Sequence, residues 1–172
     1  MMLQQLVAAV EPWKSAYSNS KIIPVAVTSV HLVALLFGGG LAVAADRATL
    51  RVGRRGAADQ ATQLDELRAV HKPVLVALVG LFASGVLLAA ADLETFATSP
   101  VFWVKLGLVV LLLVNGLVLE RTESRLRGLS AREIVPTGRV QSLWRRLRKS
   151  AVLSLVLWTA TLVAGTLLVN IS

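Results

Sequence analysis

The chain has 172 residues, a net charge of +8 and no cysteine, and 55% of its residues are hydrophobic against 16% charged. Its mean hydropathy of +0.69 excludes a water-soluble globular domain of this size. Aromatic residues are scarce, so the apolar content is leucine, valine and alanine, which is typical of lipid-facing helices rather than β-barrels. The absence of cysteine excludes disulfides, thiolate metal sites and Cys-linked haem.

The first 17 residues lack a basic start, and Glu11 and Pro12 interrupt their apolar run, so they do not resemble a cleaved signal peptide. Their apolar residues fall on one helical face, which consists of Leu3, Leu6, Val7 and Val10. We therefore expect a short interfacial helix on the outer membrane surface, with Trp13 as its anchor. Residues 18–20 form a break before the first span.

Four apolar stretches are long enough to cross about 30 Å of hydrocarbon. They cover about 22–45, 73–91, 101–119 and 151–172. The sequence therefore predicts an all-α membrane protein, a four-transmembrane-helix bundle that forms a single domain over residues 1–172. Small residues let helices approach closely in lipid, and they mark the expected contacts at Ala34, Gly38, Ala42, Gly80, Ser84, Ala160, Thr161, Ala164 and Gly165.

Basic residues are concentrated in two of the three connections between spans. Six lie between the first two spans and nine between the third and fourth, whereas residues 92–100 contain none. The positive-inside rule places both basic connections in the cytoplasm, which predicts a multi-pass protein with both termini extracytoplasmic. This placement explains the net charge without a nucleic-acid partner, so the lipid bilayer is the expected partner.

An amphipathic stretch precedes the fourth span. Basic residues surround an apolar face made by Val140, Leu143, Trp144 and Leu147. It predicts an amphipathic cytoplasmic helix on anionic lipid. In the alternative that we favour, its basic residues only set the topology. Pro136 and Gly138 are expected to end the preceding helical piece.

Two side chains stand out inside the spans, because Lys105 is the only formally charged group and His31 the only imidazole there. At a rise of about 1.5 Å per residue, His31 lies roughly 13 Å and Lys105 roughly 6 Å below the outer face, so both fall in the outer half of the bundle. His71 precedes the second span at the opposite end, roughly 20 Å from His31 along the membrane normal. One chain therefore cannot clamp a haem between its two histidines.

Each of these groups also has a purely structural explanation. The His31 imidazole can hydrogen-bond across the bundle, and the Lys105 amine can extend to the headgroups. If both face the interior instead, Lys105 can hold a carboxylate, a haem propionate or a quinone oxygen. At the cytoplasmic end, His71 with Asp65 and Glu66 is a weaker metal candidate. No hydrolase or kinase motif occurs, and we expect Asn115 to make a cross-helix hydrogen bond.

A series of short motifs in a fixed order resembles a bacterial four-span inner-membrane family of unknown function. The likeness runs from Glu11 to about Arg121 and rests on Glu11-Pro12, Ile23-Pro24, His31, Gly38, Asp46-Arg47, Lys72-Pro73, Gly80, Gly85, the run 102–106 and Asn115. This resemblance implies a bacterial cell inner membrane and no assigned activity.

A looser similarity concerns the first-span His31 and the third-span sequence 103–106, which reads WVKL. Both features are similar to those of haem-binding membrane protoporphyrinogen oxidases and of copper-resistance membrane proteins. In the oxidases a first-span histidine and a third-span lysine are thought functional, which implies roles for His31 and Lys105. The chain has only two histidines and two methionines, so the resemblance favours haem over copper.

We therefore expect an integral membrane b-type haem-binding or redox subunit involved in electron transport. His31 would be the axial metal ligand, and Lys105 would pair with a propionate or act as second ligand. In a variant, a homodimer with its two-fold axis along the membrane normal clamps a shared haem between two copies of His31.

The alternative is a non-enzymatic membrane subunit or scaffold, in which both residues only tie helices together and the cytoplasmic face docks a membrane-complex partner. The sequence leaves enzymatic activity open. Transport is disfavoured, because the sequence indicates neither a broken helix nor a chain of carboxylates across the membrane.

Overall fold

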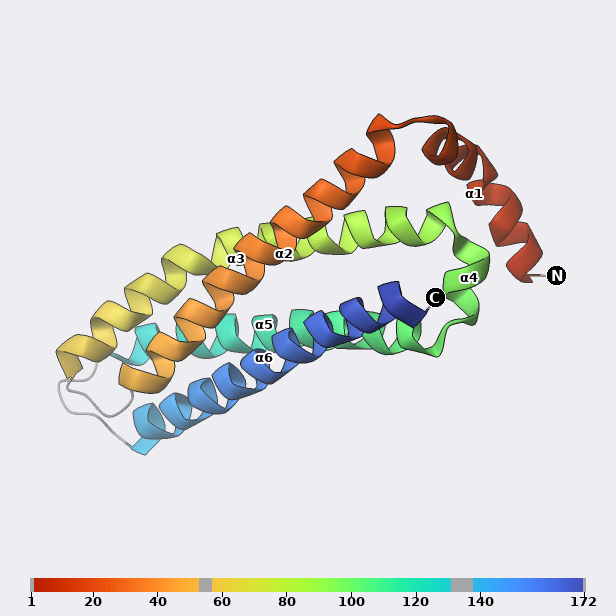
Figure 1. Cartoon of the computed structure of the whole chain (residues 1–172). Coiled ribbons are helices and arrows are strands. Elements are labelled where there is room, and N and C mark those ends of the chain that lie inside the picture. Colours follow the sequence, from red (N-terminus) through yellow and green to blue (C-terminus); the bar gives the residue numbers. More distant parts are fainter. Residues whose placement is uncertain (1, 53–56, 131–137, 172) are drawn as a thin grey trace.

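The computed structural model describes residues 2–52, 57–130 and 138–171, and these form six helices without any strand. In chain order the helices are α1 (Met2–Asn19), α2 (Ile22–Val52), α3 (Ala57–Ala91), α4 (Leu93–Thr98), α5 (Pro100–Ser130) and α6 (Gly138–Ile171) (Figure 1). The helices α2, α3, α5 and α6 are long and apolar enough to cross a membrane. The prediction of an all-α, multi-pass membrane protein with four spans is confirmed.

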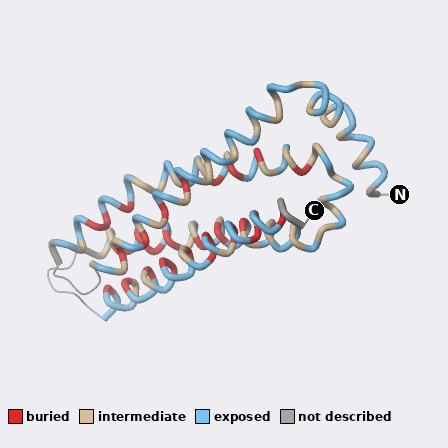
Figure 2. The backbone as a smooth tube through the Cα atoms, in the orientation of Figure 1, coloured by how far each residue is buried: buried red, intermediate tan, exposed pale blue. Residues whose placement is uncertain are grey.

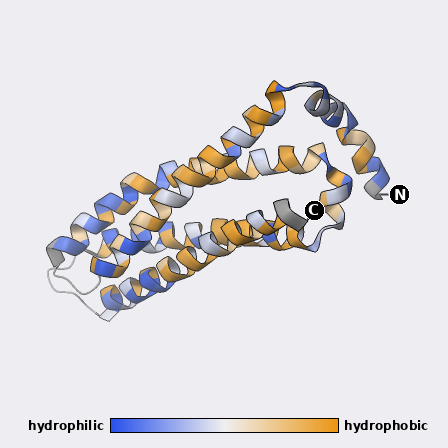
Figure 3. Cartoon of the chain, viewed as in Figure 1, coloured by the Kyte–Doolittle hydropathy of each residue, from blue (hydrophilic) through white to orange (hydrophobic). Residues whose placement is uncertain are grey.

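The bundle has two ends of different character. One end, which we call the terminal end, holds α1, α4 and both chain termini (Figure 1). The other, which we call the basic end, holds the last turns of α2 and α5 and the first turns of α3 and α6, where hydrophilic residues gather (Figure 3). Both termini therefore lie at the same end of the bundle, as four antiparallel spans require.

The helix α1 is tied to the terminal end of α3. The Trp13 indole Nε1 donates a hydrogen bond of 2.9 Å to the Leu87 carbonyl oxygen, so this ring binds a neighbouring helix. The predicted break follows α1, and the Ser20 hydroxyl oxygen accepts hydrogen bonds of 3.2 Å from the backbone N–H groups of Ile22 and Ile23. Ser20 thus satisfies two of the free donors at the start of α2.

The connection between α3 and α5 contains the short helix α4, which the sequence analysis did not anticipate. Its N-cap is Asp92, whose carboxylate accepts a 3.4 Å hydrogen bond from the Thr95 backbone N–H. The Trp103 indole then donates a 3.0 Å bond back to the Ala97 carbonyl oxygen. Pro100 begins α5, a position where its missing N–H costs little.

All four long helices extend past the apolar spans predicted for them. They contain between 31 and 35 residues, whereas about 20 residues cross a bilayer. The amphipathic stretch expected as a separate helix is instead the beginning of α6, because no helix breaker separates Gly138 from the apolar residues that follow Ser150. Pro136, expected to end the preceding helical piece, lies outside the described residues.

The bundle consists of two helical pairs, α2 with α3 and α5 with α6, which contact each other mainly through α2 and α6. A Cβ placed on Gly38 would lie 2.8 Å from the Cβ of Ala77, so α2 and α3 touch almost backbone to backbone there. A Cβ placed on Gly39 would lie 3.3 Å from the Trp158 ring of α6. The predicted contacts at the small residues Gly38, Ala42 and Ala164 are confirmed, since all three are buried.

Buried residues line the inner faces of the helices (Figure 2). One apolar cluster lies in the middle of the bundle and contains Ala42, Leu78, Leu81, Leu112, Leu157 and Trp158. A second lies at the basic end and contains Leu64, Leu67, Leu119, Leu126, Val140, Trp144 and Leu147. The outward faces are also apolar, with Leu36 at 71% and Val76 at 65% exposure, which is the surface expected of helices in a lipid bilayer.

Candidate functional site

His31 lies on the inner face of α2 and contacts α3. Its ring Nδ1 is 2.9 Å from the hydroxyl oxygen of Ser84. A Cβ placed on Gly85 would lie 3.4 Å from the ring carbon Cε1, so this glycine gives the imidazole room to pack against α3. The position of His31 is therefore fixed by two consecutive residues of the neighbouring helix.

The hydrogen bonds of Ser84 determine which ring nitrogen of His31 carries the proton. The Ser84 hydroxyl donates a 2.6 Å bond to the Gly80 carbonyl oxygen. A hydroxyl has one proton, so when Ser84 donates to Gly80 its oxygen accepts from His31, and Nδ1 is then the donor. In a neutral imidazole this leaves Nε2 with a free lone pair.

Lys105 lies on α5 and its amine reaches α6. A Cβ placed on Gly165 would lie 3.5 Å from the Lys105 Nζ atom and 3.6 Å from its Cε atom. His31 is the tenth residue of α2 and Lys105 the sixth of α5, and both helices begin at the terminal end (Figure 1). The two side chains singled out in the sequence thus belong to one region of the bundle, one from each helical pair.

This site at the terminal end offers a ring nitrogen on one helical pair and a cation on the other. A metal ion could bind Nε2. Ser84 would then orient the ring, as hydrogen-bond acceptors at the other ring nitrogen do for metal-bound histidines. An anionic group could bind the Lys105 ammonium. No cluster of three or more His, Cys, Asp or Glu side chains that could hold a metal ion occurs in the described part of the chain.

His71 lies at the basic end, far from this site, and belongs to an ion-pair network between α3 and α5. Its Nδ1 is 2.8 Å from a carboxylate oxygen of Glu123, whose other oxygen accepts a 2.8 Å bond from Arg127. Arg127 also pairs with Asp65 at 2.9 Å. The weaker metal candidate predicted from the sequence comprised His71, Asp65 and Glu66. In the structure His71 and Asp65 are linked through Glu123 and Arg127, and Glu66 is exposed.

His71 and Glu123 lie beyond the predicted apolar spans, and their pairing shifts the pKa of each. The hydrogen bond with Glu123 raises the pKa of His71 above its ordinary value, and outweighs the opposite effect of burial. Burial acts to raise the pKa of Glu123, but the hydrogen bonds from His71 and Arg127 outweigh it and lower that pKa. Both shifts favour the charged pair, so the network is an electrostatic tie between two helices.

Asp46 is a buried acidic residue whose chemistry the sequence analysis did not single out. Its side chain is 3% exposed, the Ser154 hydroxyl of α6 hydrogen-bonds it, and Oδ2 has no partner among the described residues. One turn further, the Gln63 amide donates a 3.3 Å bond to Thr49. The sequence contained a sign that Asp46 faces the bundle interior, because Asp46 and Thr49 continue the helical stripe that begins at His31.

The predicted cross-helix hydrogen bond of Asn115 is confirmed. The Asn115 amide donates a 3.0 Å bond to the Ser150 carbonyl oxygen, and the Ser150 hydroxyl donates a 2.6 Å bond to the Asn115 side-chain oxygen. Both residues are buried. The pair joins α5 to α6 through these two hydrogen bonds.

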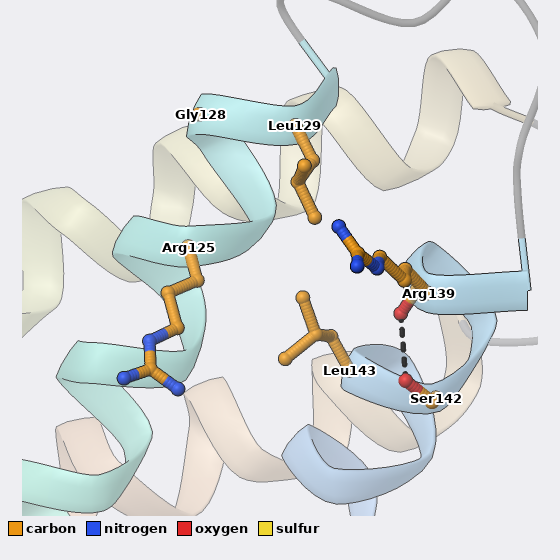
Figure 4. A pocket seen from close by; sticks show the side chains of 6 residues that line it. All are labelled: Arg125, Gly128, Leu129, Arg139, Ser142 and Leu143. Atoms are coloured by element: carbon orange, nitrogen blue, oxygen red, sulfur yellow. Dashed lines mark hydrogen bonds between the residues drawn. The ribbon is translucent and has the colours of Figure 1, made fainter.

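Two hollows lie along the α5–α6 pair. The first, of about 550 Å³, lies at the basic end and is lined by Arg125, Gly128, Leu129, Arg139, Ser142 and Leu143. Its two arginines extend in different directions and do not converge on one point (Figure 4). The second, of about 320 Å³, lies nearer the middle of the helices, on the side of Asn115 and Ser150.

No protein-family model, no curated protein and no solved structure matches this chain.

Proposed function

We propose that the chain is a membrane subunit that binds a b-type haem, with His31 Nε2 as axial ligand and Lys105 as partner of a propionate or as second ligand. The observation that carries this proposal is the 2.9 Å contact between His31 Nδ1 and the Ser84 hydroxyl, because an imidazole that donates through Nδ1 keeps the lone pair of Nε2 for iron. Haem supplies one-electron chemistry when bound, and the chain's own residues orient the ligand and balance the charge of the carboxylates.

The location of Lys105 supports the same function. Its amine lies beside Gly165 of α6, so the side chain is directed towards the neighbouring helix of the bundle. We further propose that the protein resides in the bacterial inner membrane with the basic end in the cytoplasm. This orientation follows from the distribution of lysine and arginine. It puts the haem in the outer leaflet.

The test is the absorption spectrum of the full chain, purified from cells supplied with haem. A Soret band is expected in the wild type and in His71→Gln, which removes the other imidazole. His31→Gln should lose the band, because the amide can still reach Ser84 but cannot serve as the axial imidazole. The absence of a Soret band in the wild type, or an unchanged band in His31→Gln, would refute the proposal.

A second candidate function is that of a non-enzymatic membrane subunit, in which His31 only joins α2 to α3. The contact with Ser84 and the close approach of Gly85 favour it, because both would exist without a cofactor. In that case His31→Ala lowers the thermal stability of protein prepared without haem, and the spectra of all variants are the same. The stability and the spectrum together separate the two functions.

A further inference from the structure

The second hollow is an apolar groove on the outer side of the α5–α6 pair, here called the α5–α6 groove. Its apolar walls include Leu111 and Val114 of α5 and Leu153 of α6, which are 53%, 52% and 48% exposed. Its buried residues include Leu157 as well as the Asn115–Ser150 pair. Because Asn115 and Ser150 hydrogen-bond to each other, the groove offers an occupant mainly hydrocarbon along its length.

Two cations lie at the end of this groove nearest the basic end. Arg146 and Lys149 line it and are exposed, and neither forms an ion pair with another described residue. No acidic side chain lines the groove. Both cations immediately precede the fourth apolar span, which starts near residue 151, so they lie at the level of lipid headgroups.

The dimensions of the groove correspond to one leaflet of a bilayer. Arg146 and Leu157 are eleven residues apart on α6, which is roughly 16 Å along a helix and about half of the 30 Å hydrocarbon thickness. From the basic end inwards, the groove is lined first by cations and then by hydrocarbon side chains. A single phospholipid has the complementary order, with a charged phosphate followed by an acyl chain.

We propose that the α5–α6 groove binds one anionic phospholipid, with its phosphate at Arg146 and Lys149 and an acyl chain along Leu153 and Leu157. Charge complementarity selects an anionic headgroup over a zwitterionic one, because the groove carries two positive charges and no negative one. This site is independent of the haem proposal, since it lies on other helix faces and at the opposite end of the span.

The test is native mass spectrometry of the full chain in detergent, titrated with phosphatidylglycerol and with phosphatidylcholine of the same acyl chains. The wild type should bind phosphatidylglycerol more tightly. Arg146→Gln/Lys149→Gln should weaken that binding by about 30-fold, because each cation near a headgroup contributes about fivefold. The matched control Arg139→Gln/Arg145→Gln removes the same charge from exposed positions of α6 outside the groove and should retain the preference.

A second pair of variants tests the acyl slot. Val114→Trp fills the groove and should reduce binding of both lipids, whereas Val110→Trp, one turn away on an exposed position outside the groove, should not. Soluble glycerol phosphate should fail to displace the bound lipid. The proposal of a phospholipid site would be overturned if the two charge variants lost phosphatidylglycerol binding equally. It would also be overturned if the two tryptophan variants bound lipid equally, or if glycerol phosphate displaced the lipid.

Discussion

Substitution of Gly38 tests the close approach of α2 and α3. An alanine there would place its Cβ 2.8 Å from the Cβ of Ala77, whereas carbon atoms in ordinary contact lie about 3.5–4.0 Å apart. The helices α2 and α3 would have to separate by roughly 1 Å. Overpacking of this kind costs about 1–3 kcal/mol in unfolding free energy. The separation would also lengthen the bond between His31 and Ser84, which lie two turns away on the same helix pair.

Gly40, in the same run of three glycines, provides the control for Gly38→Ala. A Cβ on Gly40 meets no atom within 4 Å, so Gly40→Ala gains the same helix propensity, about 1 kcal/mol, without a clash. The difference between Gly38→Ala and Gly40→Ala therefore isolates overpacking, and Gly38→Ala should be about 1–3 kcal/mol less stable. Gly39→Ala should fall between them, because its Cβ lies 3.3 Å from the Trp158 ring.

The measurement is reversible unfolding of each purified variant from mild detergent into SDS, followed by circular dichroism. Thermal unfolding in the same detergent gives an independent ranking. If Gly38→Ala proves as stable as Gly40→Ala, α2 and α3 do not meet at Gly38, and the register that aligns His31 with Ser84 is wrong as well.

Two further predictions concern the polar ties. The pKa of His71 is raised above 6.5, so its contribution to the stability of the fold is complete below pH 6.5 and is lost as the pH rises through the raised pKa. The pKa of Glu123 is lowered below 4.5, so its contribution is complete above pH 4.5 and is lost as the pH falls through the lowered pKa. The difference in unfolding free energy between wild type and Glu123→Gln should therefore be largest between about pH 4.5 and 6.5 and shrink towards pH 9, and a difference that stays constant over this range would contradict the network. In a double-mutant cycle, Asn115→Leu and Ser150→Ala should each destabilise the protein, and the double variant should lose about 0.5–3 kcal/mol less than the sum of the two. Strict additivity would mean that the two side chains do not interact.

The four spans could be predicted because a long apolar run is a local property that membrane thickness alone demands. The true helix lengths could not, since the turns beyond the spans are stabilised by the cluster around Leu126 and Leu147, which forms only when α3, α5 and α6 meet. The helix α4 was missed for a different reason. It is six residues long, and its Asp92 cap acts over a single turn.

At the site, the inward orientation of His31 could be predicted from its stripe of small residues, but its partner could not. Whether Ser84 or another hydroxyl meets the imidazole depends on the register between α2 and α3, which Gly38 and Ala77 set far along the helices. The same holds for His71. Its neighbours in sequence are Asp65 and Glu66, yet its partner is Glu123, which comes from another helix.

The polar ties are distributed unevenly along the bundle. Among the described residues, the polar ties between the two helical pairs include those of His71 with Glu123 and Asp65 with Arg127 at the basic end, and that of Asp46 with Ser154 nearer the middle of α6. Towards the terminal end the two pairs diverge (Figure 1). The ion pairs that join the two helical pairs are therefore concentrated at the basic end, where they hold α3 against α5.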